Sequence, residues 1–131
     1  MLHTKRLLAA KPILFLAILY SCFISVLFLL PGQDLPKISL TGLDKIVHSL
    51  IYFMLVNLWL CYFYIKMDFQ ISNKLVLILL LSALFYGIIV EILQGTVTGT
   101  RSADILDVAA NLIGSLLGIF FFKQVKNKLK T

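Results

Sequence analysis

The residues of this chain that could do chemistry are concentrated between Gly87 and Gly118. Six polar or ionisable side chains interrupt an otherwise apolar sequence there: Glu91, Gln94, Arg101, Asp104, Asp107 and Asn111. Carboxylates accept hydrogen bonds and bind cations, and a guanidinium can hold a phosphate or a carboxylate through two parallel hydrogen bonds. An ionisable group at the centre of a membrane helix costs roughly 2.5–3.5 kcal/mol on insertion scales. Several such groups in one short window therefore indicate a specific requirement.

Composition places the chain among membrane proteins. Of its 131 residues, 60% are hydrophobic and 14% are charged, and the mean hydropathy is +0.99. A soluble domain carries about 25% charged residues. We therefore expect one all-α membrane domain over residues 1–131. The net charge of +6 does not predict a nucleic-acid partner, because the chain offers no soluble face for one.

Four apolar runs predict a polytopic bundle of four transmembrane helices. The expected helices cover residues 12–30, 44–65, 75–94 and 103–122. Each is about 20 residues long, which spans about 30 Å of hydrocarbon at 1.5 Å per residue. Pro12 suits a first helical turn, Gly95 suits the left-handed position after a helix, and Ser102 suits an N-cap.

The placement of lysine and arginine predicts the orientation. With the N-terminus inside, the outer segments hold only Lys37, Lys45 and Arg101, and nine basic residues are cytoplasmic: Lys5, Arg6, Lys11, Lys66, Lys74, Lys123, Lys126, Lys128 and Lys130. This excess follows the positive-inside rule. We expect a multi-pass protein of the inner (cytoplasmic) membrane with both termini cytoplasmic.

This topology brings the polar residues together at the outer ends of the last three helices. Residues at i and i+4 share a helix face, so Asp44, His48 and Tyr52 form one stripe. The candidate binding residues are Asp44, Lys45, His48, Tyr52, Glu91, Gln94, Arg101, Asp107 and Asn111. The ridge Ala110–Gly114–Gly118 lets another backbone approach closely. It turns Asp107 and Asn111 into the bundle, and it also offers a face for an oligomer.

Several chemistries fit such a cluster. An excess of acids in low dielectric favours a shared proton, a raised carboxylate pKa, a bound cation or a protonated imidazole. Glu91, His48 and Asp107 are the catalytic candidates, but no convincing nucleophile accompanies them. One histidine with carboxylates could hold a divalent ion. Because the chain has no HExxH motif, paired histidines or cysteine ligand spacing, we expect no metal cofactor. A network that only fixes helix packing is the alternative.

Three segments of the chain resemble the VanZ-like family of small bacterial membrane proteins. They are DKIVHSLIYF (residues 44–53), EILQ (residues 91–94) and RSADILDVAANLIGSLLG (residues 101–118), and from the first to the last they span about 75 of 131 residues. The resemblance assigns family positions to Asp44, Lys45, His48, Tyr52, Glu91, Gln94, Arg101, Asp107, Asn111, Gly114 and Gly118. The first helix and the lysine-rich tail lie outside these segments. The hairpin also lacks the proline that often precedes the family's arginine.

The resemblance implies a cell-envelope context, because the family is named after a protein associated with low-level teicoplanin resistance. Combined with the topology, it predicts a polar pocket that faces outward and engages a lipid, a lipid-linked envelope precursor or a glycopeptide. Arg101 and Lys45 would hold the anionic part of that ligand. Whether the chain is an enzyme stays open: a membrane hydrolase or transferase acting on a lipid headgroup and a structural or assembly subunit are the alternatives.

Overall fold

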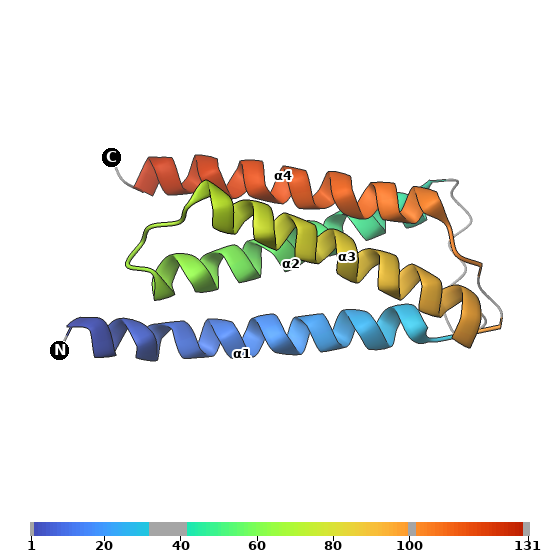
Figure 1. Ribbon diagram of the computed structural model, residues 1–131, viewed down its shortest axis with the longest axis horizontal. Coiled ribbons are helices and arrows are strands. Elements are labelled where there is room, and N and C mark those ends of the chain that lie inside the picture. Colours follow the sequence, from blue (N-terminus) through green and yellow to red (C-terminus); the bar gives the residue numbers. More distant parts are fainter. Residues whose placement is uncertain (1, 32–41, 100–101, 130–131) are drawn as a thin grey trace.

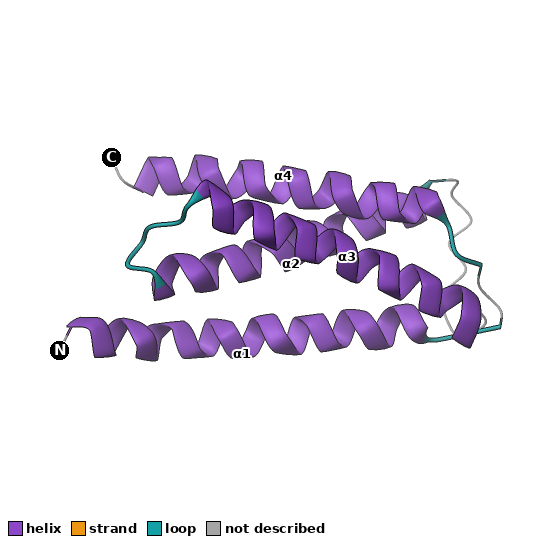
Figure 2. Cartoon of the chain, in the orientation of Figure 1, coloured by secondary structure: helices purple, strands orange, loops and turns teal. Residues whose placement is uncertain are grey.

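The computed structural model of the chain describes residues 2–31, 42–99 and 102–129. These residues form four α-helices and no strand (Figures 1 and 2). The helices are α1 (Leu2–Leu29), α2 (Leu43–Lys66), α3 (Asn73–Val97) and α4 (Ile105–Leu129). The predicted all-α fold with four long helices is confirmed.

Successive helices run in opposite directions, so both chain termini lie at the same end of the bundle (Figure 1). We call this the terminal end; it also contains the turn between α2 and α3. The opposite, loop end contains the end of α1, the start of α2, the end of α3 and the start of α4. The most extensive packing is between α2 and α4, followed by that between α1 and α2. The first helix therefore joins the bundle mainly through α2.

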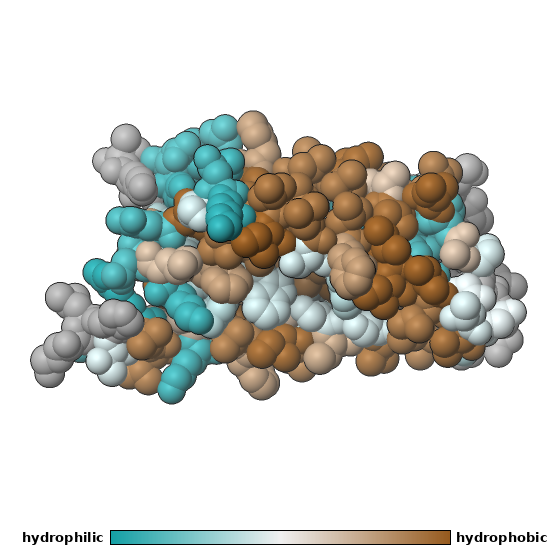
Figure 3. All heavy atoms as spheres, in the orientation of Figure 1, coloured by the Kyte–Doolittle hydropathy of each residue, from teal (hydrophilic) through white to brown (hydrophobic). Residues whose placement is uncertain are grey.

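The surface is that of a membrane protein. A broad apolar band covers the visible face between more hydrophilic ends (Figure 3). All four helices are long and apolar enough to cross a membrane. A helix satisfies its backbone hydrogen bonds internally, which a segment in hydrocarbon requires. Large apolar side chains such as Phe15, Phe85 and Phe120 are more than 60% exposed, as expected where lipid covers the protein.

Glycines on α4 set the close approach of α2 and α4. A Cβ atom at Gly114 would lie 2.7 Å from the carbonyl carbon of Ser49 and closer still to its oxygen. At Gly118 it would lie 3.0 Å from the carbonyl oxygen of Phe53. The predicted small-residue ridge is thus a packing face within one chain. Since α2 covers this ridge, it is not exposed to a second copy of the chain.

The helices extend beyond the predicted apolar runs, and three expectations about their ends were wrong. Pro12 lies inside α1, because the helix continues through the polar N-terminal residues. Gly95 lies inside α3, where a Cβ would lie 3.1 Å from the backbone nitrogen of Ala103, and Gly99 adopts the positive φ of 62°. Asp104 caps α4 instead of Ser102, because its carboxylate accepts the Leu106 N–H at 2.8 Å.

Candidate functional site

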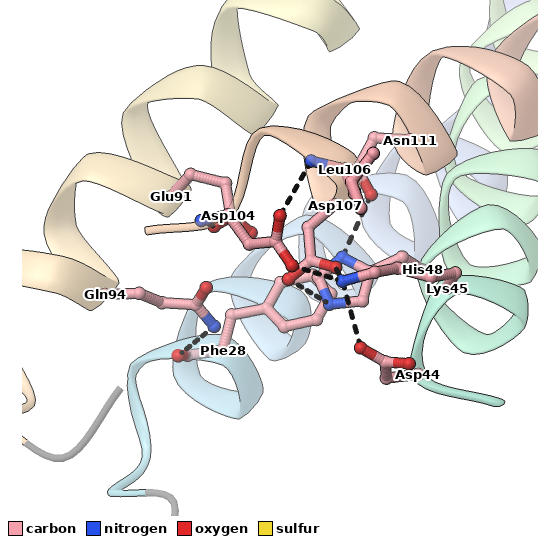
Figure 4. Close-up of polar contacts among 10 residues, drawn as sticks. All are labelled: Phe28, Asp44, Lys45, His48, Glu91, Gln94, Asp104, Leu106, Asp107 and Asn111. Atoms are coloured by element: carbon pink, nitrogen blue, oxygen red, sulfur yellow. Dashed lines mark hydrogen bonds and ion pairs between the residues drawn. The ribbon is translucent and has the colours of Figure 1, made fainter. Parts of the chain in front are cut away.

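A polar cluster joins α2, α3 and α4 at the loop end. Its members are Lys45, His48, Glu91, Asp104, Asp107 and Asn111. Figure 4 shows these side chains converging from the start of α2, the end of α3 and the start of α4. In this nearly all-apolar bundle, His48, Glu91, Asp107 and Asn111 are each at most 7% exposed. Polar groups buried to this degree must find partners within the protein or in a ligand.

Lys45 is the cation of the cluster. Its ammonium donates to Asp104 at 2.6 Å, contacts Asp44 at 3.0 Å and forms a short ion pair with Asp107. The side chain of Asp107 is only 10% exposed, whereas those of Asp104 and Asp44 are 39% and 60% exposed. Lys45 therefore links two carboxylates near the surface to one inside the bundle.

The imidazole of His48 lies below Lys45 on the same helix and is held on two sides. Its Nδ1–H donates to the Asn111 amide oxygen at 3.1 Å, and its ring stacks on Phe28 of α1 at 4.6 Å between centroids. Nε2 faces Asp107 Oδ2 across 3.6 Å, a distance too long for a hydrogen bond. The histidine is thus fixed in orientation, with Nε2 directed at a carboxylate.

Glu91 and Gln94 bring α3 into the cluster. The Glu91 carboxylate accepts the backbone N–H of Asp104 at 3.0 Å, and Gln94 donates to the carbonyl oxygen of Phe28 at 2.8 Å. Phe28 lies in the last turn of α1, where helical carbonyls lack partners within the helix. Gln94 therefore caps α1, and Glu91 fixes the segment that leads into α4 (Figure 4).

Tyr52 extends the cluster deeper into the bundle. The side chain is fully buried, and its hydroxyl has no hydrogen-bond partner in the described part of the chain. A Cβ atom at Gly87 would lie 3.2 Å from that hydroxyl and 3.1 Å from Asn111 Nδ2. Glycine at this position keeps room for both polar groups. Burial of a hydroxyl without a hydrogen bond costs free energy.

Negative charge dominates the described part of the cluster. Among the described residues, the carboxylates of Asp44, Asp104 and Asp107 contact the one ammonium of Lys45, and the Glu91 carboxylate accepts the Asp104 backbone N–H. The Lys45 ammonium holds the pKa of the Asp104 carboxyl below its ordinary value of 3.8, and the Leu106 N–H adds to this effect. Hydrogen bonds to the charged form stabilise it. Asp104 is therefore a carboxylate at neutral pH.

The sequence analysis placed most of these residues together, and the structure refines their positions. Lys45, His48, Glu91, Asp107 and Asn111 converge, with Tyr52 and Gln94 next to them. Asp44 does not enter the bundle, although it shares a helix stripe with His48. Arg101 lies outside the described residues.

Two residues of this region are absent from the candidate binding residues. Asp104 was expected among the polar residues but not among those that bind, yet its carboxylate binds Lys45 and its backbone N–H donates to Glu91. Phe28 gave no signal, because only the alignment of α1 with α2 places its ring on His48.

A separate cavity of about 420 Å³ lies between α1, α2 and α3, away from the polar cluster. Its lining is mostly apolar and includes Leu55, Trp59, Leu79 and Ala83. Ser21 and Tyr86 supply polar atoms at one side, where the Tyr86 hydroxyl donates to the Ser21 carbonyl at 2.8 Å. No Asp, Glu, His, Lys or Arg is among the described residues that line it.

Comparison with known protein families identifies the chain. The sequence model of the VanZ/LLP1 family matches residues 25–126. The chain belongs to the VanZ/LLP1 family. No curated protein and no solved structure matches the chain. The match begins within α1 and so includes Phe28, and it ends within the basic end of α4. The VanZ-like region is therefore wider than the motif segments of the sequence analysis, which began only at Asp44.

Proposed function

We propose that this VanZ/LLP1 protein is a multi-pass protein of the bacterial inner membrane whose polar cluster binds the headgroup of a membrane lipid or a lipid-linked envelope precursor. The observation that carries this proposal is the position of three buried groups. His48, Glu91 and Asp107 lie within 4.8 Å of one another at one end of an apolar bundle. Ionisable residues retained in membrane segments usually serve substrate or ion recognition. The basic residues at the terminal end support an outward-facing loop end.

Exposure within the cluster supports entry of a ligand from the loop end. The Asp104 side chain is 39% exposed, Lys45 is 28% exposed, and Asp107 and His48 are 10% and 4% exposed. The polar groups thus continue from the surface into the bundle without an apolar gap. A headgroup at the membrane surface would meet the rim formed by Asp104 and Lys45 first, while its acyl chains remain beside the helices.

The charges favour particular headgroups. The Lys45 ammonium already binds three carboxylates, so it has little charge to offer a phosphate. Carboxylates only accept hydrogen bonds when ionised. The cluster therefore favours a headgroup that supplies hydroxyl or ammonium donors, with Tyr52 and Asn111 adding further polar contacts. Binding of an anionic portion by Arg101 stays a prediction.

The Tyr52 hydroxyl offers a selective test. Tyr52→Phe removes an oxygen that has no hydrogen-bond partner among the described residues, so unfolding of the ligand-free protein should be unchanged or slightly harder. If this hydroxyl binds the headgroup, native mass spectrometry should show at least a several-fold loss of retained lipid. Tyr62→Phe, at the other end of α2, is the matched control. Equal lipid retention by both variants would contradict this contact.

A cellular experiment tests the link to the envelope. Glu91→Gln keeps the shape of the side chain and removes its charge. We expect it to abolish any protection against teicoplanin that the wild-type chain confers, while membrane insertion and protein level stay normal. A matched control is Gln124→Glu, which alters a charge at the terminal end. Loss of protection only in parallel with loss of folded protein would contradict a specific role for Glu91.

A catalytic function on the same headgroup is favoured by one observation, the fixed imidazole directed at Asp107. His48 or Glu91 would act as the general base. Incubation of the purified protein with labelled envelope lipids tests this alternative. Headgroup release that disappears in His48→Gln and persists in Asp44→Asn would establish an enzyme. Binding without turnover would leave the protein a binding module.

A structural role is favoured by the contacts of Lys45 and Glu91, which tie three helices together. Exchange of the charges of one ion pair distinguishes this role from a binding site. The double variant combines Lys45→Asp with Asp104→Lys. A network that only fixes packing should recover function in the double variant relative to either single variant. A site that recognises a headgroup should stay inactive although the protein folds.

A further inference from the structure

The geometry points to a divalent transition-metal site formed by His48, Glu91 and Asp107. These residues come from α2, α3 and α4, are all buried, and offer ligand atoms within 4.8 Å of one another. A nitrogen with two carboxylate oxygens is a ligand set that suits Zn²⁺ and its first-row neighbours. The inference deepens and rests on the proposed function, because the same cluster carries both.

The spacing of His48 and Asp107 fits two ligands of one ion better than it fits a direct contact. Nε2 of His48 and Oδ2 of Asp107 are 3.6 Å apart. Two ligand atoms of a tetrahedral ion with bonds of about 2.0–2.2 Å lie roughly 3.4 Å apart. With Nδ1–H donating to Asn111, Nε2 is the ring nitrogen left to face Oδ2 of Asp107. An imidazole that binds a metal through Nε2 needs this arrangement.

Each ligand is oriented by a second contact, which is typical of metal sites. Asn111 accepts the Nδ1–H of His48, and the Phe28 ring stacks on the imidazole. Lys45 binds Oδ1 of Asp107, which leaves Oδ2 directed at His48. The backbone N–H of Asp104 binds one oxygen of Glu91. The three ligands are thus held in place by other groups, and movements of about 1 Å would close the site.

The charge of the cluster also favours a dication. Three carboxylates share the ammonium of Lys45 among the described residues, and the ligand carboxylates of Asp107 and Glu91 are buried. Three protein ligands would leave a coordination position open, as in zinc sites that bind a substrate. An ion there would allow a cluster rich in acids to bind a phosphate or hydroxyl of a lipid headgroup. The sequence contains no known metal motif because each of the three residues comes from a different helix.

Direct metal binding tests the inference. The full chain, purified in detergent with a tag that contains no histidine, would be stripped with a chelator and then titrated with Zn²⁺. We expect one Zn²⁺ per chain by elemental analysis after desalting, and a higher unfolding temperature. Glu91→Gln and His48→Gln should weaken binding by about 100-fold, and Asn111→Ala by about 10-fold. Asp68→Asn, which removes an exposed acid at the terminal end, and His3→Ala are the controls and should bind as the wild type does.

Cobalt provides a measurement that does not depend on the folding of variants. Co²⁺ added to the stripped wild-type protein should give the intense visible bands of a four- or five-coordinate ion, and X-ray absorption should show one imidazole ligand. The inference would be overturned if the wild type does not retain Zn²⁺ or if Co²⁺ gives the spectrum of the hydrated ion. It would also be overturned if folded Glu91→Gln retains as much Zn²⁺ as the wild type. Lipid retention by the stripped protein distinguishes the two proposals. If the protein retains lipid but binds no metal, only the metal site is wrong. If it binds metal but retains no lipid, the headgroup function is contradicted.

Discussion

The two ends of the bundle are held together by different kinds of interaction. At the loop end, one ammonium, an imidazole and several carboxylates join α2, α3 and α4, and Gly114 brings α2 and α4 into backbone contact. Towards the terminal end, α1 meets α2 and α3 through rings, neutral hydrogen bonds and a cavity of about 420 Å³, and the Arg6–Asp68 ion pair there is exposed.

The difference indicates which part is rigid. Charged networks in low dielectric have one good arrangement, and removal of a member leaves an uncompensated charge. Neutral hydrogen bonds between membrane helices are each worth about 0.6 kcal/mol on average. Side chains beside a cavity can also repack at low cost. The loop end is therefore suited to hold ligand groups in fixed positions, and the contacts of α1 near the cavity are suited to adjust.

The largest expected effect tests the close contact of α2 and α4. Gly114→Val places side-chain atoms against the Ser49 backbone, which cannot move without separating the helices, and we expect a loss of about 3 kcal/mol or more. Ala83→Val adds similar bulk beside the cavity and should cost under about 1 kcal/mol. Thermal unfolding in detergent measures both. Equal losses would remove the distinction between the two ends.

The second prediction concerns the cation of the loop end. Lys45→Met leaves the buried Asp107 carboxylate without its ammonium, and we expect a loss of about 3 kcal/mol. Lys45→Arg should recover most of that loss, because the charge is kept. Asp44→Asn removes an exposed partner and should change stability by under about 0.5 kcal/mol. A Lys45→Met protein as stable as the wild type would show that the ion pairs do not hold the loop end together.

The third prediction concerns the neutral contacts of α1. Tyr86→Phe removes a hydroxyl that donates to the Ser21 carbonyl at 2.8 Å and lies 2.6 Å from the Ser25 hydroxyl. We expect a loss of about 0.6–1.7 kcal/mol, well below that of Lys45→Met. Tyr62→Phe, which also removes only a tyrosine hydroxyl, is the matched control. A loss from Tyr86→Phe that matched Lys45→Met would reverse the proposed contrast.

The smallest effect is a dependence of stability on pH. The pKa of Asp104 is lowered by the Lys45 ammonium, so this carboxyl stabilises the fold above the ordinary aspartate pKa of about 3.9 and loses that contribution as pH falls through the lower folded value. Unfolding temperatures measured between neutral pH and about pH 3 should fall more for the wild type than for Asp104→Asn. Identical pH profiles would mean that Asp104 contributes no net stability through Lys45.

Much of the site could be predicted from residue types and helical periodicity. The i,i+3 and i,i+4 spacing places Glu91 and Gln94 on one face of α3, and Asp107 and Asn111 on one face of α4. All four are buried as expected. The same rule failed for Asp44, whose side chain is 60% exposed, because it lies one turn nearer the loop end than His48. The signals for helix ends also failed at Pro12 and Gly95, because both residues lie inside longer helices.

The sequence by itself determined that this chain is a four-helix membrane protein with its polar residues at one end. Hydrophobic length and the cost of burying charge in lipid fix those features, and both act locally. Only the tertiary structure decided which atoms meet. Three contacts depend on the axial alignment of separate helices. They are the stacking of Phe28 on His48, the binding of Glu91 to the Asp104 backbone, and the approach of His48 Nε2 to Asp107. That alignment is set by side-chain packing between helices, which periodicity along one helix does not contain.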